Sequence, residues 1–249
     1  MTKTLLNFES YLEKANRAKT KEELFNIYSA TVLQHGLDKV LLCLATDHRD
    51  IGEDAGMKFM HNYPQDWMSY YFEKELNTID PVIIYGFTVA DSFKWDEVTR
   101  KMNLSRAQKA CMNLGVEAGL YNGICTPLRG PSNAIGGLSL AASEKRDSFD
   151  GKIDLITAYS NHFYLAYRRL GEKALQGAHQ TVCNFALTAK ERDVLSWAAK
   201  GKSYGDIATI LETSDHTIDF HIRNIFKKLE VNHMVLAVVK AMTYGLIHP

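Results

Sequence analysis

Apolar residues recur at intervals of three and four along much of the chain, which is the spacing of amphipathic helices. Over residues 5–35 this spacing predicts two helices separated by a lysine-rich break, the second starting near Glu22 and ending at Gly36. The same spacing predicts further helices over 64–75, 104–117 and 150–176.

Short apolar runs of strand length interrupt these helices at 39–46, 121–128 and 134–142. The last two runs are joined by Arg-Gly-Pro-Ser-Asn, a segment of turn-forming residues. Helices before, between and after strands are typical of a sheet covered by helical layers. We therefore expect an α/β N-terminal domain, an α-β-α sandwich with a mainly antiparallel sheet.

Residues 187–229 have the plan of a helix-turn-helix: two short helices broken at Gly201, then a longer helix opened by Ser214. Thr188 and Glu191 fit a capping box, and Gly201 suits the left-handed residue that ends a helix. A fourth helix is expected over 234–244. The predicted domains are residues 1–171, a linker over 172–186, and an all-α helix-turn-helix domain over 187–249.

The third of these helices has two distinct faces. Ile218, Ile222, Ile225 and Leu229 form its apolar stripe. Early residues of a recognition helix contact base edges, and later cations contact phosphates. We therefore interpret the residues on or near the opposite face as DNA-binding: Thr217, Asp219, Phe220, Arg223 and Lys227. The alternative is a helical bundle that only packs, with these charges solvated.

Charge limits this interpretation. The net charge is zero, with 46% hydrophobic and 23% charged residues, which indicates a globular protein and excludes one that coats nucleic acid or membrane non-specifically. Residues 187–249 hold eight lysines and arginines against seven aspartates and glutamates. A DNA-binding domain is usually more basic, so useful affinity would require a dimer.

The four cysteines are widely spaced and include no CxxC pair. They are typical of buried thiols in a reducing compartment, so we expect neither a disulfide framework nor a metal site. No apolar run approaches the ~20 residues that span a bilayer, and the first fifteen residues do not form a signal peptide. We therefore expect a cytoplasmic protein without a membrane partner.

Aromatic and polar side chains with ligand-binding potential occur in the N-terminal half: Tyr63, Trp67, Tyr71, Asp80, Trp95 and Ser139. Trp67 and Tyr71 are four residues apart and share a helix face, Asp80 precedes Pro81, and Trp95 falls in a separate loop. Such a mixture suits an apolar cavity whose few polar groups orient a small amphipathic ligand. The alternative is that the aromatics are core residues and Asp80 a turn or cap residue.

The C-terminal segment closely resembles the DNA-binding domain of LuxR-type transcription regulators. It departs from the pattern at Thr213, Asp206 and His233. The N-terminal half resembles the autoinducer-binding domain of acyl-homoserine-lactone receptors. The residues that carry the two resemblances most strongly are Trp67, Tyr71, Asp80, Pro81, Trp95 and Gly123, with Glu191, Leu195 and Gly201 in the second domain.

This resemblance implies roles for the candidate residues. The Trp67 indole would donate to the lactone carbonyl, Asp80 would accept from the ligand amide, and Tyr63 and Ser139 would bond the acyl carbonyl. Tyr71 and Trp95 would be walls, while Pro81, Gly123, Glu191, Leu195 and Gly201 would be structural. The implied signal is an N-acyl-homoserine lactone, with no cofactor. A homodimer formed through residues 153–170 would read a palindromic promoter site in double-stranded DNA.

Other function classes fit less well. A phosphorylation-driven response regulator would need a phosphoacceptor aspartate in an acidic cluster, which residues 39–50 do not provide. An enzyme acting on lactones would need a nucleophile or metal set. The GxSxG match at Gly201–Gly205 lies between two predicted helices of the helix-turn-helix and not between a strand and a helix, and no clustered histidine motif occurs. A receptor of the same architecture that answers a non-lactone signal, or none, stays open.

Overall fold

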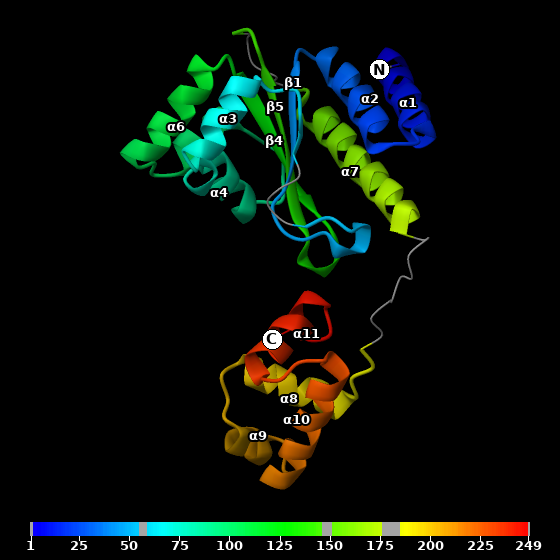
Figure 1. The fold of residues 1–249 in the computed structure, drawn as a ribbon, viewed down its shortest axis with the longest axis vertical. Coiled ribbons are helices and arrows are strands. Elements are labelled where there is room, and N and C mark those ends of the chain that lie inside the picture. Colours follow the sequence, from blue (N-terminus) through cyan, green and yellow to red (C-terminus); the bar gives the residue numbers. More distant parts are fainter. Residues whose placement is uncertain (1, 55–58, 146–150, 176–184, 249) are drawn as a thin grey trace. The chain divides into compact units, whose positions relative to one another are not determined.

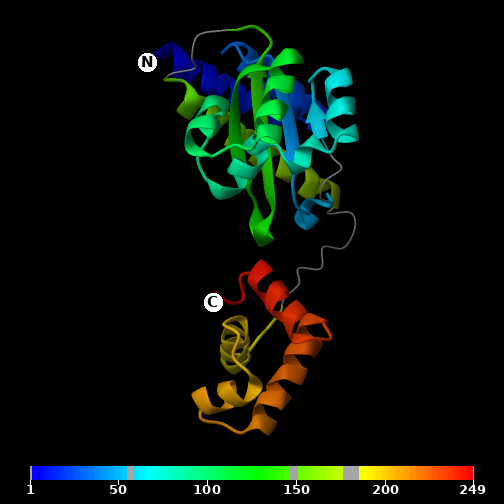
Figure 2. The same cartoon turned by 90° about the vertical axis from the view of Figure 1, so that its left-hand side faces the viewer.

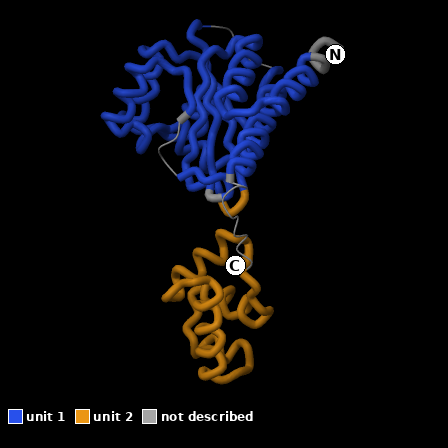
Figure 3. Tube along the Cα trace, turned by 45° about the vertical axis from the view of Figure 1, so that its right-hand side comes forward, with its two compact units in different colours: residues 1–130, 134–179 blue, residues 131–133, 180–249 orange. Residues whose placement is uncertain are grey.

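The computed structural model describes residues 2–54, 59–145, 151–175 and 185–248. The chain divides into two compact units, residues 1–130 with 134–179 and residues 131–133 with 180–249 (Figure 3). Helix α7 continues to Leu175, past the end of the first domain predicted at 171. Much of the predicted linker lies outside the described residues.

The first unit is built on a five-stranded antiparallel sheet in the order β2-β1-β5-β4-β3. The central strands β1 (Lys39–Leu44), β4 (Tyr121–Arg129) and β5 (Ile135–Ala142) are the three predicted from apolar runs. The edge strands β2 (Phe59–His61) and β3 (Phe93–Lys94) were not predicted, because two or three residues are too few for a periodic signal.

Helices cover both faces of the sheet, which confirms the α-β-α sandwich. One layer contains α1 (Thr2–Arg17), α2 (Lys21–Leu33) and α7 (Ile153–Leu175). The other contains α3 (Gln65–Glu73), α4 (Pro81–Thr88), α5 (Trp95–Lys101) and α6 (Arg106–Glu117). Figure 1 shows the two layers on opposite sides of the strands, and in Figure 2 the second layer crosses in front of them.

The face toward α1, α2 and α7 holds the main hydrophobic core. Alternate residues of β1 are buried there, led by Val40 and Leu42, and they pack with Tyr28 and Phe163 in one cluster. The Tyr28 hydroxyl lies 2.7 Å from the Ser160 Oγ, so this large side chain is buried with its polar atom satisfied. Because this face is filled by side chains, the space for a ligand lies on the other one.

Two of the helices in the second layer were not predicted. Asp80 caps α4 and Pro81 is its first residue, where a missing N–H costs nothing. Trp95 begins α5 rather than lying in a loop, because the Glu97 carboxylate accepts from the Lys94 amide and caps this short helix. Pro64 is the N-cap of α3 and not part of its first turn.

The second unit is all-helical: α8 (Ala189–Ala199), α9 (Tyr204–Ile210), α10 (Asp215–Leu229) and α11 (Met234–Thr243). Thr188 and Ser214 cap α8 and α10 as predicted, and Ser203 caps α9. Gly201 has a φ of +77°, which confirms the left-handed position. The unit has its own core, in which the apolar stripe of α10 is buried against α8, α9 and α11.

Cys43, Cys111 and Cys125 are free thiols, whereas Cys183 lies outside the described residues. None of the helices described here is long and apolar enough to cross a membrane. Within the described ranges, histidine, cysteine and carboxylate side chains form no cluster able to hold a metal ion.

Candidate functional site

A cavity of about 950 Å³ lies between the sheet and the helices α3 to α6. Its floor comes from β1, β4 and β5, and its walls come from the four helices. All six residues proposed as ligand contacts from the sequence line it: Tyr63, Trp67, Tyr71, Asp80, Trp95 and Ser139. The structure thus brings together residues separated by up to seventy-six positions in the chain.

Asp80 is the polar centre of the cavity. Its Oδ2 accepts a hydrogen bond of 2.8 Å from the Tyr71 hydroxyl, and its Oδ1 accepts one of 2.8 Å from the Val82 amide. Burial raises the pKa of Asp80, although both hydrogen bonds lower it. The cap interpretation of Asp80 is therefore correct, but the same carboxylate also lines the cavity.

The other predicted contacts surround this carboxylate. The rings of Trp67 and Tyr71 are 5.6 Å apart and share the inner face of α3. The Tyr63 hydroxyl donates a long bond of 3.3 Å to the backbone carbonyl of Ser139. Burial raises the pKa of both Tyr63 and Tyr71, so both phenols stay protonated and can donate.

Gly123 has a steric role that the sequence resemblance marked but did not explain. A Cβ added at Gly123 would lie 2.1 Å from the Trp95 ring, so only glycine lets the indole pack on β4. The Trp95 Nε1 atom is buried and has no hydrogen-bond partner among the described residues.

The sequence did not reveal the small residues on the sheet floor. Cys43, Cys125 and Gly137 all line the cavity, and burial raises the pKa of the Cys43 thiol to about 11 and that of Cys125 to about 12. The thiols are therefore neutral near pH 7, as expected for buried cysteines. The alternation of residues along a strand shows which side chains face the helices. Only the pairing register between strands shows which of these side chains are neighbours.

Arg129 is a second feature that no sequence signal indicated. Its Nη2 donates to the carbonyls of Gly86, Phe87 and Val89 at 2.9, 3.4 and 3.0 Å. These carbonyls belong to the C-terminal end of α4, where a cation is favourable. Arg129 thereby fixes the far end of the helix that Asp80 caps.

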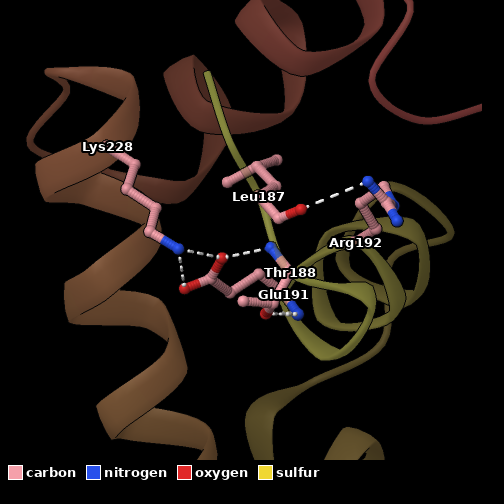
Figure 4. A network of polar contacts seen from close by, with 5 residues as sticks. All are labelled: Leu187, Thr188, Glu191, Arg192 and Lys228. Carbon is pink, nitrogen blue, oxygen red and sulfur yellow. Dashed lines mark hydrogen bonds and ion pairs between the residues drawn. The ribbon is translucent and has the colours of Figure 1, made fainter. Parts of the chain in front are cut away.

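In the second unit, buried Glu191 joins α8 to α10 (Figure 4). Its carboxylate accepts from the Thr188 amide at 2.7 Å and from the Lys228 ammonium at 2.7 and 2.9 Å. Burial opposes the charged form, but these hydrogen bonds outweigh it and the pKa of Glu191 lies below its usual value. Leu195 is fully buried in the core of the same unit, so both residues have structural positions.

The outer face of α10 carries the proposed DNA contacts. Asp219, Arg223 and Lys227 are exposed, and Phe220 is 56% exposed. Thr217 is half-buried, with its hydroxyl 2.9 Å from that of Ser214 at the start of the helix. An exposed phenylalanine flanked by charges on a recognition-type helix is consistent with a binding face.

Two families of known proteins match the chain. Residues 20–167 match the family described as "Autoinducer binding domain", and residues 186–241 match "Bacterial regulatory proteins, luxR family". The first match covers more than half of the chain and contains every residue proposed to line the ligand site.

Curated relatives agree with both matches. The chain is 34% identical to the "Transcriptional activator protein VanR" of Vibrio anguillarum over 76% of each chain. It is 25% identical to the "Transcriptional activator protein LuxR" of Aliivibrio fischeri over 96% of this chain and 94% of that one.

Among solved structures, Escherichia coli SdiA has the same fold, with a TM-score of 0.60 and 24% identity over 97% of this chain and 98% of its own. A second SdiA structure, "in complex with octanoyl-rac-glycerol", matches with a TM-score of 0.54 and 24% identity over 97% of this chain and 96% of its own.

Proposed function

The chain belongs to the LuxR family of quorum-sensing transcription regulators, with an autoinducer-binding domain followed by a helix-turn-helix domain, and we propose that its signal is an N-acyl-homoserine lactone. Because this is a family of regulators, the enzyme alternative is excluded. In this proposal the protein acts in the cytoplasm, and the liganded homodimer binds a palindromic promoter site.

The observation that carries the proposal is the carboxylate of Asp80 in a largely apolar cavity. The two carboxylate oxygens have about four lone-pair sites, and Asp80 accepts from Tyr71, from the Val82 amide and from the Ile83 amide, which leaves a site for a ligand. An ionised carboxylate only accepts, so a complementary ligand must bring a donor. The amide N–H of an acyl-homoserine lactone is such a donor.

The remaining contacts follow from the groups that surround Asp80. The Trp67 indole N–H would donate to the lactone carbonyl, and Tyr63 and Ser139 would bond the acyl carbonyl. Tyr63 can turn from its long bond to the Ser139 backbone without losing a strong one. Tyr71 and Trp95 would enclose the headgroup, with Tyr71 also orienting Asp80.

The DNA-binding half of the proposal depends on dimerisation. A domain with nearly balanced charge gains little from phosphate contacts, so two copies are needed for useful affinity. Residues 153–170 of α7 would form the dimer face, where Leu165 is 54% exposed. Thr217, Asp219, Phe220, Arg223 and Lys227 of each copy would then contact one half-site.

A second candidate is a receptor for a non-lactone signal, such as a monoacylglycerol, or a receptor that acts without ligand. One observation favours it: Tyr71 and Val82 already give Asp80 two hydrogen bonds, so the carboxylate is not without partners in the absence of an amide. In addition, a protein of the same fold is described in complex with octanoyl-rac-glycerol, which has no amide.

The substitution Asp80→Asn tests the proposed amide contact. Asparagine is an equally good N-cap, so α4 should keep its start, while the charged acceptor for the ligand N–H is lost. We expect octanoyl-homoserine lactone to bind about 5- to 150-fold more weakly, the equivalent of about 1–3 kcal/mol for a lost buried partner. Isothermal titration calorimetry on the purified chain measures this.

Asp96→Asn is the matched control, because Asp96 also lines the cavity but is exposed and paired with Arg100. It should leave lactone affinity within about twofold of the wild type, since exposed pairs contribute little. Equal lactone affinity for wild type and Asp80→Asn would remove the amide role. A wild-type chain that binds octanoylglycerol but not the lactone would establish the second candidate instead.

A further inference from the structure

Gly137 occupies an unusual position for a glycine in the middle of a sheet. It lies in β5 and pairs with Cys43 of β1 on one side and Pro127 of β4 on the other. Glycine weakens a strand interior, so its presence there commonly marks a special backbone conformation, a tight contact or the close approach of a ligand.

The first two reasons do not apply to Gly137. Its φ is not positive, so any residue could adopt its backbone conformation. An added Cβ would meet nothing closer than 3.9 Å, the distance to the Cys125 Sγ and the Thr126 carbonyl. The neighbouring Gly136 is different, because a Cβ there would lie 2.8 Å from the Cys43 carbonyl oxygen.

The missing side chain leaves room on the cavity floor in a definite direction. Ser139, the proposed partner of the acyl carbonyl, pairs with Leu41 and Cys125, and Gly137 is two residues further along β5. The cavity lining continues from Ser139 through Gly137 to Ile135 and does not include Ala141 on the opposite side.

Helix α4 runs along the same direction and supplies an apolar wall. Asp80 caps the start of α4 at the polar end of the cavity. Arg129 pairs with Ile135 in the sheet and binds the carbonyls at the other end of α4. Ile83 and Phe87 of α4 line the cavity, as do Ala45 and Pro127 from the floor. The lining also includes the polar side chains of Glu75, Asn77 and Lys109, which suit an apolar tail poorly. Helix α6 contributes the apolar residues Met112 and Val116 as well.

From this geometry we infer that Gly137 admits the apolar tail of the ligand and selects for medium and long acyl chains. Two residues of an antiparallel strand span about 7 Å, which an extended hydrocarbon covers with roughly five or six carbons. Butanoyl chains therefore end before Gly137, whereas octanoyl and dodecanoyl chains cross it. The inference rests on the proposed function, because the distance along the strand is counted from Ser139 as the partner of the acyl carbonyl.

Substitutions at Gly137 test this with a built-in comparison between ligands. Gly137→Ala and Gly137→Val are titrated with butanoyl-, octanoyl- and dodecanoyl-homoserine lactone, and in parallel with the corresponding monoacylglycerols. Gly137→Val should weaken dodecanoyl binding about tenfold or more and leave butanoyl binding within about twofold, with a smaller loss in the same direction for Gly137→Ala. Thermal unfolding without ligand checks the fold, and Gly137→Ala should unfold no earlier than wild type because its Cβ fits.

Gly205→Ala makes the same chemical change in α9, where a Cβ meets only the Asp215 carboxylate at 4.0 Å, and should leave every ligand affinity unchanged. A loss that is equal at all chain lengths, or no loss at all, overturns the role of Gly137. If lactones fail to bind wild type but monoacylglycerols show the length-dependent loss, the lactone proposal fails and the tail inference stands. A wild-type chain that binds neither series overturns both.

Discussion

Asp219 is the residue whose charge most clearly opposes its proposed role. It is exposed on α10, one turn before Arg223, whose Nε donates to the Asp219 backbone carbonyl at 3.3 Å. A carboxylate on a DNA-facing surface is repelled by phosphates, but it can accept from the N4 amino group of cytosine. In the proposed DNA-bound arrangement, Asp219 would therefore favour base selectivity at the expense of affinity.

The substitution Asp219→Asn should separate these two effects. Removing the negative charge should strengthen binding to random-sequence DNA, while the preference for cytosine at one half-site position should fall by about 1–3 kcal/mol. Fluorescence anisotropy with the preferred site, single-base variants and random DNA over a range of salt concentrations measures both. Asp193→Asn on α8 is the control for charge alone, and unchanged selectivity in Asp219→Asn would remove this residue from the base contacts.

At this scale the sequence identified the chemistry of the site but not its shape. The types and spacing of Trp67, Tyr71 and Asp80 suited an apolar ligand cavity, and the family resemblance then assigned them contacts with a headgroup. The sequence resemblance singled out Gly123 without giving the reason, which is that any Cβ at this position would lie 2.1 Å from the indole of Trp95. Gly137 was missed because its meaning depends on the residues across the sheet.

Among the elements, α8 and α10 are joined by a pair whose contribution can be isolated. Glu191 is 2% exposed and serves both the capping box of α8 and the ammonium of Lys228. Glu191→Gln keeps an acceptor for the Thr188 amide but removes the charge, so Lys228 alone loses its partner. We expect a loss of about 1–3 kcal/mol in the unfolding free energy of the second unit, measured by urea denaturation.

The pH dependence gives this pair a further signature. The pKa of Glu191 is lower in the folded than in the unfolded chain, so its stabilisation is present above about pH 4.5 and is lost as the pH falls through the folded value. Wild type should therefore lose more stability than Glu191→Gln on acidification from pH 6. Asp206→Asn changes an exposed capping box at α9 and should cost less, and parallel pH profiles for wild type and Glu191→Gln would contradict the role of the pair.

Elements were predicted well where the pattern was long enough to be periodic. The helices α2, α6 and α10 and the strands β4 and β5 were predicted with ends within a few residues. Helix α4 has eight residues with a high apolar content, and its amphipathic pattern is weak because it contacts β4 and also forms a wall of the cavity. Its start at Asp-Pro was visible as a turn, but nothing in the local sequence required a helix after it.

The whole molecule consists of two units with separate hydrophobic cores. The core of the second unit contains only residues from Phe185 onward, and the cavity is lined only by residues of the first unit. A ligand that binds only the folded state stabilises the unit that holds it by mass action. Ligand binding should therefore raise the stability of the first unit and leave that of the second unchanged.

Differential scanning calorimetry of the full chain with increasing octanoyl-homoserine lactone tests this division. At a free ligand concentration about one hundred times Kd, the first unit should gain about 2.7 kcal/mol, which corresponds to roughly 5–10 °C in Tm. The transition of the second unit should stay in place, as should that of a fragment of residues 185–249, which contains the whole second core. If both unfolding transitions shifted together, the two units would unfold as one. The bound ligand would then act on the DNA-binding unit through shared stability rather than through dimer formation.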